Sequence, residues 1–180
     1  MLIGLTGRNA AGKTTVVNWF ADRGFKKGSC SDSIRTWLTK KGLDSTRENL
    51  IQGGRDLRSM HGPGILAEML LEEFQGQNAI VDSIRTTAEV NALRERGDFY
   101  LIEIRADQDV RWERSRERSR EGDPLTKADF IDAENEELVS KDEVGQSLIA
   151  TAELADYVIE NDGDVESLEL ILQAFLDSHL

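Results

Sequence analysis

The residues with the clearest chemical signature lie near the N-terminus, where Gly7–Thr14 reads GRNAAGKT and fits G-x-x-x-x-G-K-[ST] without a mismatch. Glycines let such a loop curl so that successive backbone N–H groups point at phosphate oxygens, and the helix that follows directs its dipole at the same anion. The lysine, here Lys13, reaches the β- and γ-phosphates of a nucleotide, and the hydroxyl of Thr14 binds Mg²⁺. We therefore expect an ATP site along the whole segment, formed by Gly7, Arg8, Asn9, Ala10, Ala11, Gly12, Lys13, Thr14 and Thr15.

A phosphate-binding loop (P-loop) occurs in several classes of protein, and the sequence argues against the GTP-binding switch proteins. Those proteins need D-x-x-G after the third apolar strand, whereas this chain has Asp82-Ser83-Ile84-Arg85. The segment 126–129 (TKAD) matches the guanine-reading pattern [NT]-K-x-D, but it follows a polar stretch rather than a buried strand. Thr126 and Asp129 instead have the spacing of a capping box, which predicts the start of a helix.

Two D-x-x-R pairs follow expected strands, Asp32 with Arg35 and Asp82 with Arg85. The carboxyl ends of parallel strands meet at the edge where ligands bind, so both pairs are expected to face one crevice. Asp82, after the apolar run 79–81, is the expected carboxylate for Mg²⁺ beside Thr14. The two arginines could clamp a phosphate group. The alternative for each pair is a helix cap or a local salt bridge.

Five arginines, at positions 111, 114, 116, 118 and 120, occupy one ten-residue stretch of an expected helix. Arg114 and Arg118 are four residues apart, where like charges repel unless an anion lies between them. The break at 122–124 (GDP) then predicts a short lid over about 111–126 that brings positive charge to the transferred phosphoryl group and excludes water. The alternative is a solvated helix with self-paired ions.

Apolar runs and turn signals alternate along the chain in the manner of strands and helices. The expected strands are 1–6, 25–30, 79–82, 99–105 and 156–160. The expected helices are 13–23, 32–41 with Asp32 as its N-cap, 46–60, 64–75, 87–96, one from about 107, and a final helix capped by Asp164. This order predicts an α/β fold in three layers: a parallel sheet of about five strands covered by helices on both faces, as one domain over 1–180.

The composition is that of an ordinary globular chain, with 180 residues, 39% hydrophobic residues and a net charge of −12. A surface with this much negative charge repels nucleic-acid backbones and anionic lipid. Neither a nucleic-acid polymer nor a membrane is therefore an expected partner. No apolar stretch is long enough to span a membrane, and the single cysteine, Cys30, excludes an internal disulfide. We expect a cytoplasmic protein with a small anionic ligand; its oligomeric state does not follow from the sequence.

Taken together, these segments resemble the adenylate-kinase-like nucleoside and nucleotide kinases. Members of that class carry a P-loop, a D-x-x-R before the acceptor-binding helices, a D-G-x-x-R-type segment after the third strand, and lid arginines spaced R-x-x-x-R. The chain as a whole is most similar to archaeal P-loop proteins related to dephospho-CoA kinase, through 81–85 (VDSIR), Leu57-Arg58 and 155–161 (ADYVIEN). It departs from adenylate kinases at Cys30-Ser31, where they have Thr-Gly, and at Ser83-Ile84, where they have Gly-aromatic-Pro.

The resemblance implies an ATP–Mg²⁺-dependent kinase whose acceptor is small and phosphorylated, a nucleoside or deoxynucleoside monophosphate. The helical segment of about 32–76 would then bind the acceptor, which would be held by Asp32, Arg35, Arg58 and Arg85. The metal would be held by Thr14 and Asp82, and the candidate catalytic residues are Lys13, Arg114, Arg118 and Asp32. Two alternatives remain: a hydroxyl kinase of the dephospho-CoA kinase type, in which Asp32 orients or deprotonates the alcohol, and a nucleotide-binding sensor or assembly factor with slow ATPase activity.

Overall fold

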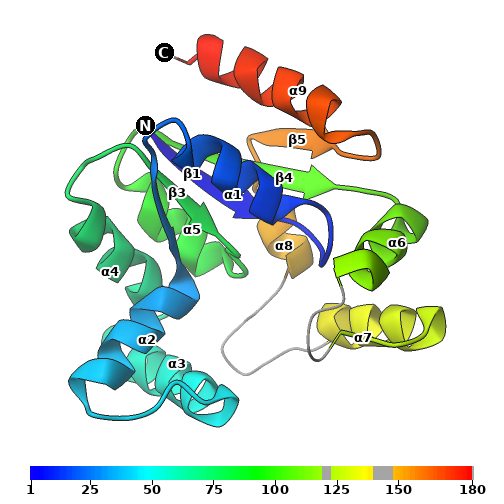
Figure 1. The fold of residues 1–180 in the computed structure, drawn as a ribbon. Coiled ribbons are helices and arrows are strands. Elements are labelled where there is room, and N and C mark those ends of the chain that lie inside the picture. The colour runs from blue at the N-terminus through cyan, green and yellow to red at the C-terminus, as the bar shows by residue number, and fades with distance from the viewer. Residues whose placement is uncertain (119–122, 140–147, 180) are drawn as a thin grey trace.

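The computed structural model describes residues 1–118, 123–139 and 148–179, and within them five strands form one parallel sheet in the order β2-β3-β1-β4-β5 (Figure 1). In chain order the strands are β1 (Leu2–Thr6), β2 (Lys26–Ser29), β3 (Ala79–Asp82), β4 (Phe99–Arg105) and β5 (Tyr157–Glu160). The order of the strands reverses at β1, which pairs with β3 on one side and with β4 on the other. Ligands of open α/β sheets bind at such a reversal, beyond the carboxyl ends of the strands.

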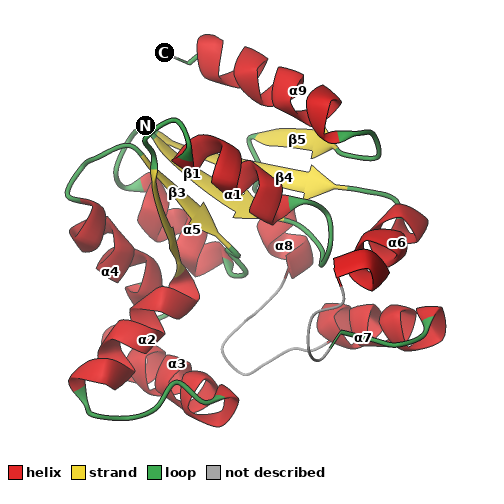
Figure 2. Cartoon of the chain, in the orientation of Figure 1, coloured by secondary structure: helices red, strands yellow, loops and turns green. Residues whose placement is uncertain are grey.

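Helices cover both faces of the sheet, as Figure 2 shows. The helices are α1 (Lys13–Ala21), α2 (Cys30–Lys40), α3 (Arg47–His61), α4 (Ile65–Phe74), α5 (Thr87–Arg94), α6 (Gln108–Arg118), α7 (Lys127–Val139), α8 (Leu148–Ala152) and α9 (Val165–Asp177). Side chains alternate along β1: Ile3 and Leu5 enter a core with α1 and α9, while Leu2 enters a second core with α2 to α5. The predicted fold class, a parallel sheet between two helical layers, is confirmed.

The sequence placed most elements within a few residues of their observed bounds, but the start of α2 was wrong. Asp32 was expected to be its N-cap; the helix begins at Cys30, and Ser29 precedes it. Asp32 lies at the third helical position, where its Oδ2 accepts hydrogen bonds from the Ser29 backbone N–H at 2.9 Å and the Ser29 hydroxyl at 2.8 Å. The pair forms a capping box, so the carboxylate of Asp32 is engaged in starting the helix.

Two further expectations concern the lid and the membrane. The predicted lid, 111–126, covers most of α6 and the residues before α7, and its part 119–122, with Arg120, lies outside the described residues. Over the described part of the chain, none of the helices combines the length and the apolar character that crossing a bilayer would take.

Candidate active site

The P-loop joins β1 to α1, and its two outer glycines occupy positions that other residues could not fill without strain. Gly7 has φ +131°, and a Cβ there would lie 2.3 Å from the carbonyl oxygen of Ile104 on β4. Gly12 has φ +105°, and a Cβ there would lie 2.2 Å from Nδ2 of Asn161. Both the left-handed backbone and the close approach of neighbouring groups therefore require glycine. These contacts fit the loop tightly against β4 and the segment after β5.

Lys13 crosses back over the loop that precedes it. Its Nζ donates hydrogen bonds to the carbonyl oxygens of Gly7 at 2.6 Å and Arg8 at 2.8 Å. A lysine held in this way keeps its charge at the mouth of the loop, at the start of α1, where the dipole of the helix also favours an anion. Thr14 and Thr15 lie on the first turn of the same helix.

A cavity of about 640 Å³ opens above the loop, and many of the residues singled out in the sequence share it. Along the P-loop and α1 it is lined by Gly7, Asn9, Ala10, Gly12, Lys13, Thr14 and Thr15; from the other elements, by Asp82, Ser83, Ile84, Arg85, Arg114, Arg118, Leu148, Asn161, Gly163, Val165 and Leu168. The cavity thus combines a phosphate-binding loop, a carboxylate and three arginines. Two of the predicted ATP-binding residues do not line this cavity. Ala11 is buried within the loop, and Arg8 lines a separate pocket beside the end of β4.

Thr14 and Asp82 are the residues here that suit a magnesium ion. Both line the cavity, one on α1 and one at the end of β3. A hydroxyl and a carboxylate are hard oxygen donors, and Mg²⁺ bound with a nucleotide takes its other ligands from phosphates and water. Asp82 Oδ1 also accepts the N–H of Ser83 at 2.7 Å, which fixes the carboxylate beside the loop. The donor set therefore fits the ion that accompanies ATP.

The two predicted lid arginines reach the cavity from α6, and each is held by specific groups. Arg114 donates to the carbonyl oxygens of Asn161 at 2.8 Å and Gly163 at 3.1 Å. Arg118 makes two hydrogen bonds of 2.8 Å to the carboxylate of Asp123 and one of 3.0 Å to Oδ1 of Asn9. Arg114 thus contacts neutral carbonyls and has no carboxylate partner among the described residues, while the charge of Arg118 is shared with Asp123.

Three of the predicted acceptor residues do not line this cavity. Asp32 and Arg35 form a half-exposed salt bridge of 2.9 Å with each other, which is the local pairing that the sequence left as an alternative. Arg58 lies on α3, where its side chain is 10% exposed and pairs with the buried carboxylate of Glu89 at 3.2 Å. Among the predicted acceptor residues, Arg85 is therefore the one that the fold brings to the P-loop.

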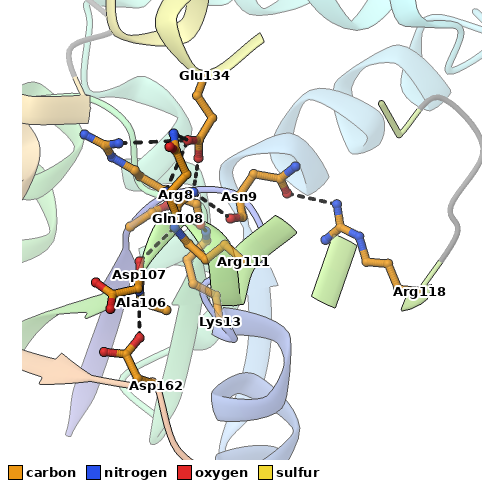
Figure 3. A network of polar contacts seen from close by, with 11 residues as sticks. Arg8, Asn9, Lys13, Ala106, Asp107, Gln108, Arg111, Arg118, Glu134 and Asp162 are labelled. Carbon is orange, nitrogen blue, oxygen red and sulfur yellow. Dashed lines mark hydrogen bonds and ion pairs between the residues drawn. The ribbon is translucent and has the colours of Figure 1, made fainter. Parts of the chain in front are cut away.

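A buried ion pair that the sequence did not suggest supports the tip of the P-loop (Figure 3). Arg111 on α6 is 2% exposed and bonds to the carboxylate of Glu134 on α7, which is 5% exposed. Arg111 also donates to the carbonyl oxygens of Ala106 at 2.9 Å and Asn9 at 3.4 Å, and Gln108 donates to Glu134 at 2.9 Å. Burial, together with the nearby charge of Arg8, lowers the pKa of Arg111.

Asn161, after β5, is a second residue that sequence reasoning did not single out. Its side-chain N–H donates to the carbonyl oxygen of Ala11 at 2.8 Å, and it is 5% exposed. The sequence showed it only as the last residue of 155–161, one of the segments that carry the family resemblance. The partners of Arg111 and Asn161 lie 23 and 150 residues away, so no local spacing could reveal them.

The fold and the loop together define the class: this is an α/β protein of the P-loop NTPase fold. Solved structures share the fold over nearly the whole chain. They include TT1252 from Thermus thermophilus, with a TM-score of 0.63, 20% identity and coverage of 100% of this chain and 98% of that one. A shikimate kinase from Aquifex aeolicus gives a TM-score of 0.57, 16% identity and coverage of 99% and 97%.

The chain belongs to the UPF0200 family. It is 31% identical to the UPF0200 protein PH1008 of Pyrococcus horikoshii over 169 residues, which are 89% of this chain and 88% of that protein. It is also 31% identical to a UPF0200 protein of Aeropyrum pernix, over 94% of this chain and 88% of that protein. No family model matches the chain. These relatives support the expected archaeal P-loop family, while a specific relation to dephospho-CoA kinase stays a prediction.

Proposed function

We propose that this protein is an ATP–Mg²⁺-dependent phosphotransferase that moves the γ-phosphoryl group of ATP to a small phosphorylated acceptor, a nucleoside or deoxynucleoside monophosphate. One observation carries the proposal: the P-loop, the carboxylate of Asp82 and the side chains of Arg85, Arg114 and Arg118 line a single cavity of about 640 Å³. That is room for a nucleotide with its acceptor, since small-molecule sites commonly span ~300–1,000 Å³.

In this proposal each side of the cavity has its own task. The P-loop N–H groups and Lys13 hold the β- and γ-phosphates, and Arg114 and Arg118 offset the charge that develops on the transferred group. When bound through Thr14 and Asp82, Mg²⁺ would neutralise charge on the same phosphates. Arg85 holds the acceptor phosphate. One oxygen of that phosphate forms the new bond to the γ-phosphorus of ATP, while the bond between the γ-phosphorus and the bridging oxygen breaks and its electron pair leaves with ADP. An acceptor phosphate is already an anion, so the residues need not supply a strong general base.

A specific observation also favours a second candidate, a kinase that phosphorylates a hydroxyl group. Asp32 and Arg35 are engaged with each other and Arg58 with Glu89, so the acceptor side of the cavity carries less positive charge than the sequence predicted. An alcohol acceptor gains little from several guanidinium groups and needs a carboxylate, and for that role this candidate relies on Asp32, which is half-exposed in its salt bridge with Arg35. The shared fold of the shikimate kinase from Aquifex aeolicus supports keeping this second candidate.

The experiment that separates these candidates is a screen of ADP formation with ribo- and deoxynucleoside monophosphates, dephospho-CoA, shikimate and simple sugars. Our proposal predicts acceptor-dependent ADP formation with a monophosphate, and a fall in kcat/KM of about 100-fold in Arg85→Ala, the scale of a lost charge-assisted bond. The matched control is Arg116→Ala, because Arg116 is 61% exposed on α6 and pairs with Glu113. Turnover with hydroxyl acceptors alone would select the second candidate. ADP formation that no acceptor accelerates would select the sensor or assembly factor.

A further inference from the structure

The buried carboxylate of Glu89 joins α5 and the 82–86 loop before it to Arg58 on α3, which lies 31 residues earlier in the sequence. Glu89 is 1% exposed on the first turn of α5. Its Oε2 accepts the backbone N–H groups of Arg85 at 3.1 Å and Thr86 at 3.3 Å, and its Oε1 accepts a hydrogen bond from Arg58 on α3 at 3.2 Å. One carboxylate therefore ties the end of the 82–86 loop, which lines the cavity, to a helix outside it.

Arg58 is placed to serve Glu89 rather than the cavity. Its side chain is 10% exposed, it does not line the cavity, and its Nε has no hydrogen-bond partner among the described residues. Gly54, one turn earlier on α3, leaves space for it, since a Cβ there would lie 3.2 Å from Nη1 of Arg58. The guanidinium of Arg58 is thus enclosed where α3 meets α5, a contact that we call the junction.

The energetics of burial explain why the two residues act together. A carboxylate removed from water carries a desolvation cost of several kcal/mol, which a paired cation and well-placed N–H donors can offset. Arg58 supplies the cation and the 85–86 backbone supplies the donors. If Arg58 is lost, Glu89 keeps its backbone N–H donors but is left as a buried charge without a paired cation, so the junction must rearrange or admit water. Either response disturbs the backbone that Glu89 holds.

We propose that Arg58 and Glu89 form a positioning pair that fixes the 82–86 loop in the cavity, so that Arg58 acts on the reaction through Glu89 and does not contact the acceptor. This replaces the acceptor-binding role that the sequence suggested for Arg58. Its kinetic consequence rests on the proposed function, because the loop carries Asp82 and Arg85. The structural consequence, a looser junction between α3, α5 and the loop, does not depend on any substrate.

Cys30 provides a probe of the junction that needs no turnover. It is the single cysteine of the chain, it is 6% exposed, and burial together with the neighbouring Glu89 carboxylate raises the pKa of its thiol. Modification by 5,5′-dithiobis(2-nitrobenzoic acid) therefore requires the junction to open. Three variants are compared with the parent chain: Arg58→Met, Arg58→Lys, and the double variant Arg58→Met/Glu89→Gln, which removes both charges. Arg94→Met is the matched control, since it removes an arginine from an exposed ion pair on α5.

The positioning role predicts that Arg58→Met raises the labelling rate of Cys30 at least tenfold, and that Arg58→Lys recovers most of the difference. In turnover assays Arg58→Met lowers kcat, leaves the KM for ATP unchanged, and is partly rescued in the double variant. The proposal is overturned if the labelling rate of Arg58→Met equals that of the control. It is also overturned if the double variant is as inactive as Arg58→Met while the KM for the acceptor rises, because Arg58 would then contact the acceptor directly. A chain without kinase activity still gives the labelling result, so the two proposals fail separately.

Discussion

Replacing Glu134 by glutamine tests the buried support of the P-loop, because it leaves Arg111 buried without the carboxylate to which it bonds. The two side chains are 2% and 5% exposed, so solvent can do little to compensate the remaining charge. Removing one member of such a pair costs ~3–5 kcal/mol. The amide oxygen of glutamine still accepts one hydrogen bond, so we expect the lower end, about 3 kcal/mol. At ~1.4 kcal/mol per factor of ten, this is roughly a 150-fold change in the equilibrium for opening α6 and α7.

The assay is native-state hydrogen exchange over 111–118 and 127–136, accompanied by urea unfolding. The matched control is Glu113→Gln, which breaks a pair with Arg116 on the same helix whose side chains are 51% and 61% exposed; such pairs contribute ~0–1 kcal/mol. The double variant Arg111→Met/Glu134→Leu removes both charges and should recover most of the stability lost in Glu134→Gln. If Glu134→Gln and the control lose the same stability, the charge of Arg111 is solvated and the reasoning is wrong. If the double variant is the least stable chain, packing volume rather than charge holds the helices.

Three further predictions concern the loop, the lid and the last helix. Gly12→Ala should lower the affinity for ATP at least tenfold in calorimetry, because a Cβ would meet Asn161 at 2.2 Å at a φ of +105°; unchanged affinity would show that the loop adapts. Binding of a non-hydrolysable ATP analogue should slow hydrogen exchange over 111–118, because Arg114 and Arg118 gain an anion. Equal exchange with and without the analogue would show that this stretch is a solvated helix and not a lid. Hydrogen bonds from Ser167 lower the pKa of Asp164, the N-cap of α9, so its stabilising contribution is present above the pKa of unfolded aspartate and is lost as the pH falls through the folded value. Asp164→Asn keeps the cap but does not titrate, so its free energy of unfolding should fall less steeply than that of the parent between about pH 5 and pH 3; parallel curves would contradict this.

The fold could be predicted from the sequence because its signals are local. Apolar runs such as 79–82 and 99–105 coincide with β3 and β4, and Thr126 and Asp164 precede α7 and α9 as expected of helix caps. The P-loop was equally clear, since its glycines, lysine and threonine are fixed by the backbone of one short segment. Helix α8, only five residues long, gave no comparable signal.

The partners of the charged side chains could not be predicted in the same way. Arg35, Arg58 and Arg111 look alike in sequence, yet one pairs with its own helix, one with Glu89 and one with Glu134. Which carboxylate an arginine meets depends on how helices pack, and the pairs with Glu89 and Glu134 span 31 and 23 residues. The D-x-x-R spacing at Asp32 was expected to face the crevice, but the alternative of a local pair is what the structure has: Asp32 bonds to Arg35 and to Ser29 before the helix.

The central claim, that the cavity above the P-loop passes the γ-phosphoryl group of ATP to a small acceptor, is tested most directly by following the label of γ-³²P-ATP. The parent chain and Lys13→Ala are each incubated with the acceptor found in the screen, after urea unfolding has shown that both are folded. The account predicts labelled acceptor from the parent chain and a rate lower by about 10²–10³-fold in Lys13→Ala, the scale of a lost charge-stabilising contact. Label that appears only as inorganic phosphate, or transfer that is undiminished in Lys13→Ala, would contradict it.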